Sequence, residues 1–597
     1  MSVIAQVKYV TVQAIEKLYG VALQPEVVLV NATKPEFEGD YTVVLFAFVK
    51  QLKKSPDALG NELGEYLVNN NKDIFTSFNV IKGFLNLVIA DSYWVNFLHH
   101  QYTDTSFGCK EKTGKKVMVE YSSPNTNKPL HLGHLRNNFL GWSIAEILKA
   151  NGYDVAKTCI VNDRGVHICK SMVAWQLFGN GATPQSTGIK GDHLVGDYYV
   201  KFNDEYKRQI ETLKAQGKTQ EEAEKEAPIM KATQQMLIDW EAGKPEVIKL
   251  WKEMNSWVYE GFDVTYKRIG SDFDKTYYES NTYLLGKDLV EEGLKKNVFY
   301  QKEDGSVWID LTADGLDEKL VRRKDGTSVY ITQDIGLAEV KQKEFGAEQS
   351  IYVVGDEQNY HFKVLKLICR KLGLPSAEGL YHLSYGMVEL PTGKMKSREG
   401  TVVDADELVE EMINISKQKT EELGKVKDFT TEELTWLYNT IGLGALKFFL
   451  LRVDPKKKMI FNPEESIDFH GFTGPFIQYT HARIKSILRK TALDVKRETS
   501  DTLTSHVFLL PLEKSLIIQL EQFPVTIEEA AMEHDPSKVA IYIFNLAKLF
   551  NSFYTEHSIA NAETEEKKIL RLQLAQLTAQ VLKTGMNLLG IQVPERM

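Results

Sequence analysis

Two histidines, His131 and His134, lie three positions apart in the segment "SSPNTNKPLHLGHLRNN", residues 122–138. If this segment starts a helix, the spacing brings both imidazoles to one face, where they can bind the same ligand. Gly133, between them, lets a phosphate or a base approach the backbone because it has no side chain. The trio suits a triphosphate whose charge grows during displacement at the α-phosphorus. A histidine pair taken alone also fits a structural role.

A second segment with possible chemistry is "GKMKSREG", residues 393–400. This polar run lies between two glycines and contains Lys394, Lys396, Ser397 and Arg398. Cations on such a loop can approach a pyrophosphate leaving group as charge moves onto it. Taken alone, the segment fits a surface turn equally well.

The histidine segment lies between a β-rich run, "KVMVEYS", and a helical pattern, "LGWSIAEILKANGY". A second strand, "DVAKTCIVND", follows, and strand-like runs return at "SVWIDL", "SVYIT", "SIYVVGD" and "LSYGMVEL", with the helical "YHFKVLKLICRKLG" before the last. This alternation predicts a parallel α/β sheet. Ligands bind at the carboxyl ends of the strands in such sheets, which is where the histidines would lie.

The pattern along the chain predicts several domains, because 597 residues exceed what one hydrophobic core organises. We expect an α+β domain over residues 1–110 and an α/β domain over 111–400, with a charged helical insertion near 188–257. A helical connector over 401–455 and an all-α domain over 456–597 would follow.

Composition excludes few classes of protein. With 43% hydrophobic and 26% charged residues, and with no apolar run of roughly 18 residues, the chain predicts a cytoplasmic protein without a membrane segment. The net charge of −9 does not favour nucleic-acid binding. A local basic run, "HARIKSILRKTALDVKR", fits either a phosphate-binding face or a solvated helix.

The four cysteines are widely spaced, without a C-x-x-C pair. We therefore expect buried free thiols at Cys109, Cys159, Cys169 and Cys369, and no protein-ligated metal.

Taken together, the motifs are similar to those of a known family. "HLGH" and "KMKSR" resemble the two signatures of class I aminoacyl-tRNA synthetases. The blocks "VEYSSPNTNKPLHLGHLRNN", "VYITQDIG", "YVVGDEQNYHF" and "TGPFIQYTHARI" resemble the arginyl-tRNA synthetases, and the resemblance covers nearly the whole chain. It implies a Rossmann-type catalytic domain in a monomer. It also implies that L-arginine and ATP, as its Mg²⁺ complex, form arginyl-adenylate, which is then transferred to tRNA(Arg), and that tRNA binds before the adenylate forms.

The resemblance assigns ATP to His131, Gly133 and His134, and the phosphates to a set in the second segment: Lys396, Ser397 and Arg398. "KMKSR" lacks the lysine that the family has at the fourth place of this signature. The catalytic cation is therefore Lys396, shifted by one position, or Lys128, which otherwise would be a solvated lysine.

A guanidinium is planar and permanently charged, so it calls for carboxylates in a fixed arrangement. The resemblance implies Glu279 and Asp334 for this group, with Tyr330 along the aliphatic stem. For the ammonium and carboxylate of the substrate it implies Glu120, Ser122, Asn125 and Gln358. Because such a site rejects amino acids without the guanidinium, we expect no editing domain.

For tRNA, the resemblance implies an anticodon-binding domain in which Tyr479 and the terminal Met597 lie near the anticodon loop. Phe84 and Asn86 match positions that meet the tRNA elbow. For Phe476 we expect core packing.

Two other functions remain open from the sequence. A nucleotidyltransferase that is not a synthetase can use the same histidine chemistry, although the helical domain and the acidic pair argue against it. A catalytically silent tRNA-binding paralogue is disfavoured by the intact histidines.

Overall fold

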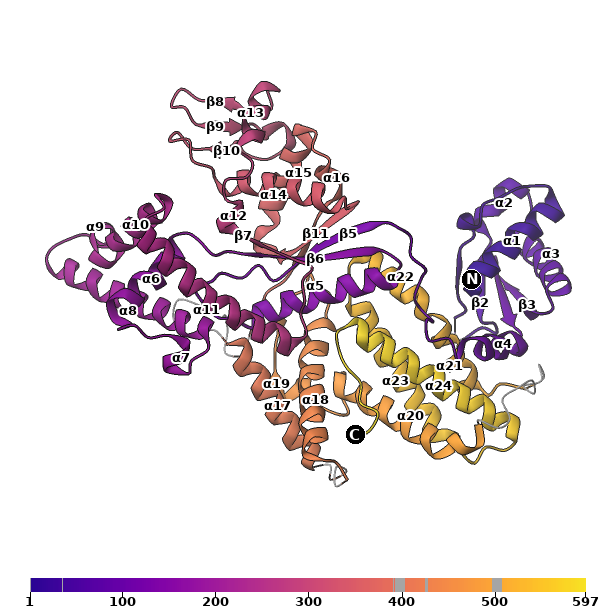
Figure 1. Ribbon diagram of the computed structural model, residues 1–597. Helices are drawn as coiled ribbons and strands as arrows, with labels where there is room; N and C mark the ends of the chain where they lie inside the picture. The colour runs from indigo at the N-terminus through magenta and orange to yellow at the C-terminus, as the bar shows by residue number, and fades with distance from the viewer. Residues whose placement is uncertain are drawn as a thin grey trace.

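Figure 1 shows the computed structural model, which describes residues 2–597 except 35, 390, 392–402, 423, 425–427 and 496–506. The predicted phosphate-binding residues Lys396, Ser397 and Arg398 therefore lie outside the described residues. So do Lys496 and Arg497 of the basic run.

A five-stranded parallel sheet lies at the centre of the molecule (Figure 1). Its order is β12-β11-β5-β6-β7, and every adjacent pair is parallel. The strands are β5 (Lys116–Glu120), β6 (Asp154–Val161), β7 (Lys275–Tyr278), β11 (Gln349–Gly355) and β12 (Leu380–Tyr385). The strand order reverses between β5 and β11, which opens a crevice at their carboxyl ends. The predicted α/β class is confirmed.

Strand β5 is covered on both faces, which explains its nearly continuous apolar sequence. Val117 and Val119 pack in one core with helix α5 (Leu132–Ala150). Met118, pointing the other way, packs in a second core with α14 (Tyr330–Phe345) and α15 (Asn359–Leu372).

A helical lobe separates β6 from β7 and extends away from the sheet (Figure 1). It consists of α6 (Val166–Phe178), α7 (Pro184–Thr187), α8 (Gly191–Ala215), α9 (Gln220–Glu226), α10 (Pro228–Glu241) and α11 (Pro245–Ile269). The helices thus begin before and end after the charged segment that the sequence singles out.

The segment between β7 and β11 differs from the sequence prediction. It contains α12 (Glu279–Thr282), α13 (Lys287–Lys295) and a separate antiparallel sheet of β8 (Tyr300–Gln301), β9 (Val307–Ile309) and β10 (Lys319–Arg322). "SVWIDL" therefore belongs to this small sheet and not to the central one. "SVYIT" is not a strand, because Tyr330 begins α14. A tertiary contact favours the helix, since the Thr332 hydroxyl donates to the Val321 carbonyl of β10.

The amino-terminal domain packs helices on a four-stranded antiparallel sheet of order β1-β2-β4-β3. Its elements are α1 (Val3–Tyr19), β1 (Val30–Ala32), β2 (Tyr41–Val44), α2 (Phe46–Leu52), α3 (Pro56–Asn70), β3 (Phe75–Ile81), β4 (Phe84–Ile89) and α4 (Asp91–Gln101). The Val3 N–H donates to Glu521 at 2.7 Å, and Lys514 lies 2.9 Å from Asp40. These contacts fasten the domain to the carboxyl-terminal helices.

The chain beyond residue 403 is predominantly helical, as predicted. Its longer helices are α17 (Ala405–Glu422), α18 (Thr431–Leu451), α20 (Gly474–Val495), α21 (Pro511–Glu521), α22 (Phe523–Glu533), α23 (Ser537–Glu556) and α24 (Glu565–Leu588). Among the described residues, α18 is the helix long and apolar enough to cross a membrane, but 72% of its most apolar window is buried inside the protein. A core helix has the same properties.

The prediction for the cysteines is confirmed for three of the four. All four thiols are free, and Cys159, Cys169 and Cys369 are buried. Cys109 is exposed, because it lies in the loop between α4 and β5.

One buried side chain, Arg136 of α5, connects the central helix to a distant part of the chain. Its guanidinium is fully buried and donates to four backbone carbonyls, those of Gly386 at 2.6 Å, Met387 at 3.5 Å, Pro455 at 3.2 Å and Lys457 at 2.9 Å. It thereby holds together the segments that lead into the paired strands β13 (Val388–Glu389) and β14 (Met459–Ile460).

Arg136→Met should lower the free energy of unfolding by about 2–4 kcal/mol, because several buried carbonyls lose their donor. Thermal unfolding followed by circular dichroism measures the change. Arg208→Met is the matched control, since its partner Glu205 is on the surface and the Arg208 side chain is 68% exposed. An equal loss of stability in both variants would contradict this role for Arg136.

Candidate active site

The predicted site residues gather at one edge of the central sheet, where its parallel strands end. Glu120 is the last residue of β5, and Glu279 follows β7 directly. Gln358 ends the short 3₁₀-helix Asp356–Gln358 that follows β11. Because parallel strands share a carboxyl edge, these residues lie along the same edge of the sheet, the edge at which such folds bind ligands.

His131 and His134 form a reciprocal cap at the start of α5. The His131 backbone N–H donates to Nδ1 of His134 at 3.2 Å, and the Gly133 N–H donates to Nδ1 of His131 at 3.1 Å. The ring centroids lie 3.9 Å apart. A side chain at position 133 would also be crowded within the protein, since a Cβ there would lie 3.0 Å from the His131 ring.

This cap determines the protonation of the two rings. A ring nitrogen that accepts an N–H carries no proton, so each neutral imidazole has its proton on Nε2. Burial, together with the nearby charge of Lys128, lowers the pKa of His131 to about 3. Burial also holds the pKa of His134 well below its usual value. Near neutral pH the pair therefore offers two uncharged Nε2–H donors.

The backbone N–H groups at this end of α5 are partly occupied. The Leu132 N–H donates to the Val403 carbonyl at 3.1 Å, and the Gly133 N–H is taken by His131. An anion at this helix end therefore meets imidazole donors in addition to the remaining backbone groups. Lys128, whose pKa burial lowers, lies close enough to affect both histidines.

The loop after β5 has a strained backbone. Ser122 and Ser123 both adopt left-handed conformations, with φ of 79° and 48°. Asn137 supports this shape, because its side chain accepts the Ser122 N–H at 2.6 Å and donates to the Val353 carbonyl of β11 at 2.7 Å. The Ser122 hydroxyl lies 2.6 Å from the Tyr266 hydroxyl, so it is engaged within the protein.

The predicted residues for the ammonium and carboxylate fall into two groups. Asn125 and Gln358 have exposed side chains. Glu120 is buried in an ion pair with Lys341, which is itself 1% exposed. Glu120 and Ser122 therefore interact with the protein, whereas Asn125 and Gln358 present amides to solvent.

The acidic pair predicted for a guanidinium is brought together. Burial, together with the nearby negative charges of Asp163 and Asp334, raises the pKa of Glu279 to about 7, so the Asp334 carboxylate lies close enough to affect Glu279. Arg164 opposes this shift. The Asp334 carboxylate lies 2.6 Å from Nε2 of His361, at the start of α15. Tyr330, one helical turn before Asp334, is 73% exposed.

Several residues of this edge escaped the sequence analysis. Asp163, buried after β6, accepts the Ser280 N–H at 2.8 Å and the Tyr259 hydroxyl at 2.8 Å, and so fixes the helix that carries Glu279. Arg164 lies over the Tyr283 ring, 4.0 Å from its centroid. The sequence feature that could have identified them is the polar segment "NDRG", residues 162–165, directly after a buried strand. Parallel sheets place ligand-binding groups at this position.

The two elbow residues predicted from the amino-terminal domain differ in exposure. Phe84 is 39% exposed and stacks edge-to-face on Phe46, with ring centroids 5.4 Å apart. Asn86 is 1% exposed and accepts from the Thr42 hydroxyl at 2.6 Å while donating to Asn79 at 2.8 Å. Phe84 is therefore accessible to a partner, and the Asn86 amide is bonded inside the sheet.

A second cavity, of about 750 Å³, lies among the carboxyl-terminal helices. Tyr479 and Met597 both line it, together with the basic residues Arg483, Arg489, Lys490 and Arg596. The chain end is held in place there, since the Pro594 carbonyl lies 3.0 Å from Nδ1 of His481. Phe476 packs on Phe544 with ring centroids 5.2 Å apart, in agreement with the expected packing.

Models of three known domain families match the chain in sequence. Residues 98–462 match the class I tRNA synthetase (R) catalytic domain, which is more than half of the chain. Residues 5–89 match the arginyl tRNA synthetase N-terminal domain, and residues 477–597 match the DALR anticodon-binding domain.

Whole-chain comparisons agree with these matches. The arginine–tRNA ligase of Flavobacterium psychrophilum is 55% identical over 597 residues, covering 98% of each chain, and that of Bacteroides thetaiotaomicron is 53% identical over 588 residues, also covering 98% of each. The structure of Thermus thermophilus arginyl-tRNA synthetase superposes with a TM-score of 0.79 at 25% identity, covering 99% of each chain. With its three domains, its neutral histidine pair and its paired carboxylates, the chain belongs to the arginyl-tRNA synthetase family of class I.

Proposed function

We propose that the carboxyl edge of the central sheet is where this chain, an arginine–tRNA ligase by family, joins arginine to ATP and then to tRNA(Arg). The observation that carries the proposal is the pairing of Glu279 with Asp334 on the same sheet edge as the two neutral histidines. One part of the edge suits a cation and the other suits phosphates.

ATP would enter as its Mg²⁺ complex and lie along the start of α5. The Nε2–H groups of His131 and His134 would donate to oxygens of the α-phosphate as charge builds up there. Neutral donors suit this task, because they stabilise the transition state without binding the free triphosphate too tightly. Lys128, with Lys396 and Arg398 of the second signature, would balance the charge of the departing pyrophosphate.

Arginine would lie across the edge with its guanidinium between Glu279 and Asp334 and its stem beside Tyr330. Asn125 and Gln358, whose amides are exposed, would contact the substrate ammonium and carboxylate. Glu120 and Ser122, which are bonded within the protein, would hold the floor of the site in shape. The arginine carboxylate would then face the α-phosphorus.

The carboxyl-terminal cavity would bind the anticodon loop, with a base stacked on Tyr479 and phosphates on Arg489 and Lys490. Phe84 would stack on an unpaired base at the tRNA elbow. Because one chain supplies every group invoked here, we propose that the protein acts as a monomer.

Charging of total tRNA with radiolabelled arginine tests the proposed function. Purified protein with ATP and Mg²⁺ should attach arginine to tRNA and should discriminate against lysine by roughly 10⁴-fold or more, because lysine cannot occupy both carboxylates. Arginine incorporation no greater than lysine incorporation would refute the assignment.

The Asp334→Asn variant tests whether Asp334 contributes to the recognition of arginine. It should raise the KM for arginine at least tenfold more than the KM for ATP, since the amide removes one charge opposite the guanidinium. Equal changes in both constants would place Asp334 outside the arginine site.

The pH dependence of arginine binding follows from Glu279. With a pKa of about 7 in the free protein, this carboxyl is largely protonated at pH 6 and ionised at pH 8. A guanidinium requires the ionised form, so the KM for arginine should fall about tenfold from pH 6 to pH 8 while the KM for ATP changes little. Glu279→Gln should bind arginine more weakly and lose this pH dependence. A steep dependence that persists in the variant would assign the titration to another group.

Tyr479→Ala tests the anticodon contact. Loss of one stacked base costs about 1–3 kcal/mol, so kcat/KM for tRNA should fall by roughly tenfold to a hundredfold. The constants for arginine and ATP at saturating tRNA should be unchanged. Tyr479→Phe, which keeps the ring, is the matched control and should behave like the wild type; an unaltered kcat/KM in the alanine variant would remove Tyr479 from the interface.

A further inference from the structure

The first signature, around His131, is joined by backbone pairing to the segment that follows the second signature. Asp404 forms an antiparallel bridge with His131, the Leu132 N–H donates to the Val403 carbonyl at 3.1 Å, and the Ala405 N–H donates to the Leu130 carbonyl at 3.0 Å. Residues 403–405 therefore lie directly against the catalytic histidine. Whatever fixes this segment also fixes the position of the His131 ring.

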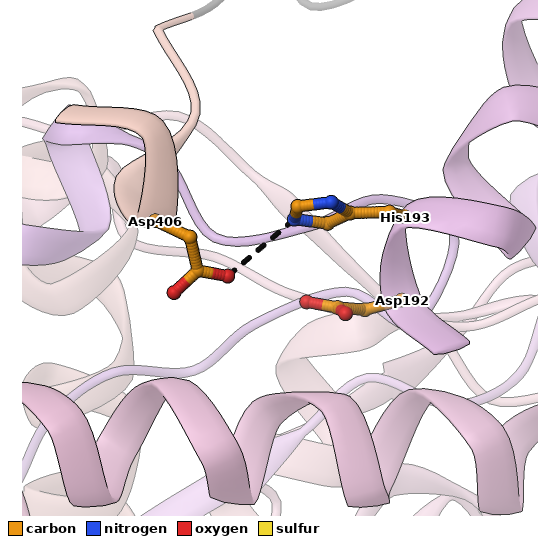
Figure 2. Close-up of side chains that lie close together, drawn as sticks. All are labelled: Asp192, His193 and Asp406. Carbon is orange, nitrogen blue, oxygen red and sulfur yellow. Dashed lines mark ion pairs between the residues drawn. The ribbon is translucent and has the colours of Figure 1, made fainter. Parts of the chain in front are cut away.

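Asp404 and Asp406 connect this segment to the helical lobe. The Nε2 atom of His193, on α8, lies 3.1 Å from the Asp404 carboxylate. It also lies 3.4 Å from the Asp406 carboxylate, as Figure 2 shows. Asp404 also caps α17, since its other oxygen accepts the Asp406 N–H at 2.8 Å. The two nearby carboxylates raise the pKa of His193 to about 10, so the ring is an imidazolium near neutral pH.

Lys190 adds a second cation to the same cluster. Its ammonium lies 2.6 Å from Asp406 and 3.0 Å from the fully buried Asp192. It also donates to the Thr265 hydroxyl of α11 at 2.6 Å. Two cations thus face three carboxylates, and two helices of the lobe meet the start of α17.

The cluster has the residue types of a metal site, because ligand atoms of Asp192, His193 and Asp406 all lie within 4.8 Å of one another (Figure 2). However, the Lys190 ammonium already bridges Asp192 and Asp406. A divalent ion would have to displace this lysine and a charged imidazole. The cluster is better explained as a set of ion pairs that holds two elements together.

We propose that His193 is a positioning residue for adenylate formation, which holds Asp404 and thereby keeps residues 403–405 against His131. The inference rests on the proposed function, in which His131 donates to the α-phosphate. In that function arginine would bind to Glu279 of α12 and Asp334 of α14, which are not members of the ion-pair cluster around His193. Loss of the His193 side chain should therefore raise the KM for ATP and leave the KM for arginine nearly unchanged.

His193→Ala should raise the KM for ATP about three- to tenfold in the charging assay, because Asp404 loses the cation beside it whereas Asp406 keeps Lys190. The KM for arginine should stay within about twofold of the wild-type value. His193→Lys, which restores a cation, should recover most of the loss. A role confined to general stability would raise both constants together and would show the same loss in the lysine variant, which would overturn the proposal.

A double-mutant cycle tests whether His193 acts through Asp404. Asp404→Asn should raise the KM for ATP, and adding it to His193→Ala should cause little further change, because both remove one interaction. Additive effects would refute the coupling. Asp197→Asn is the matched control: Asp197 is exposed one turn further along α8 and lines the same 340 Å³ cavity, and its loss should leave the KM for ATP unchanged.

Two further measurements separate the outcomes. The wild-type protein must first be shown to charge tRNA with arginine. If it does not, the proposed function fails. If it does, and His193→Ala leaves the KM for ATP unchanged, only the positioning role is refuted. Metal-free protein titrated with Mg²⁺ or Mn²⁺ should show no rise in melting temperature that depends on His193. A rise that disappears in His193→Ala would show a metal site and overturn the proposal.

Discussion

The chemistry of this site depends on the reciprocal hydrogen bonds at the start of α5. The Nδ1 atoms of His131 and His134 accept backbone N–H groups, and this has two consequences. It fixes both rings relative to the helix, and it leaves their protons on Nε2, directed away from the cap. Burial keeps both rings neutral. A triphosphate bound as proposed would meet donors whose orientation was set when the helix folded, so little reorganisation would be needed when charge develops in the transition state.

Opposite charges occupy different parts of the same sheet edge, and this division orients the substrates. In the proposed function Glu279 and Asp334 would attract a guanidinium, whereas Lys128, whose charge acts on the His131 ring, would attract phosphates. Arginine carries a cation at one end and the reacting carboxylate at the other. With its guanidinium held by the acids, the proposed pose would direct its carboxylate along the edge toward the nucleotide and bring the two reactants together where the strand order reverses.

Local sequence predicted the elements that depend on neighbouring residues. The β5–α5 unit, the histidine pair and the long carboxyl-terminal helices all follow from hydrophobic periodicity and short motifs. The prediction for "SVYIT" was wrong because a contact from Thr332 to β10 favours a helix over the strand preference of branched residues. The burial of the Asn86 amide and the exposure of Cys109 depend on which elements pack above them. Arg136 binds carbonyls more than 200 positions away, and no local pattern encodes such a contact.

The helical lobe shows why a charged insertion is more than a solvated appendage. Its sequence predicted surface helices, and most of its charges are indeed exposed. Yet α8 packs so closely on the first signature that a Cβ on Gly196 would lie 2.8 Å from Pro129. Three residues before that glycine, His193 reaches the carboxylate of Asp404. The lobe is inserted between β6 and β7, which still pair with each other in the sheet. Its last helix, α11, contacts the start of α17. An insertion placed in this way can move relative to the sheet only if these contacts change, so the position of the lobe and that of residues 403–405 beside His131 depend on each other.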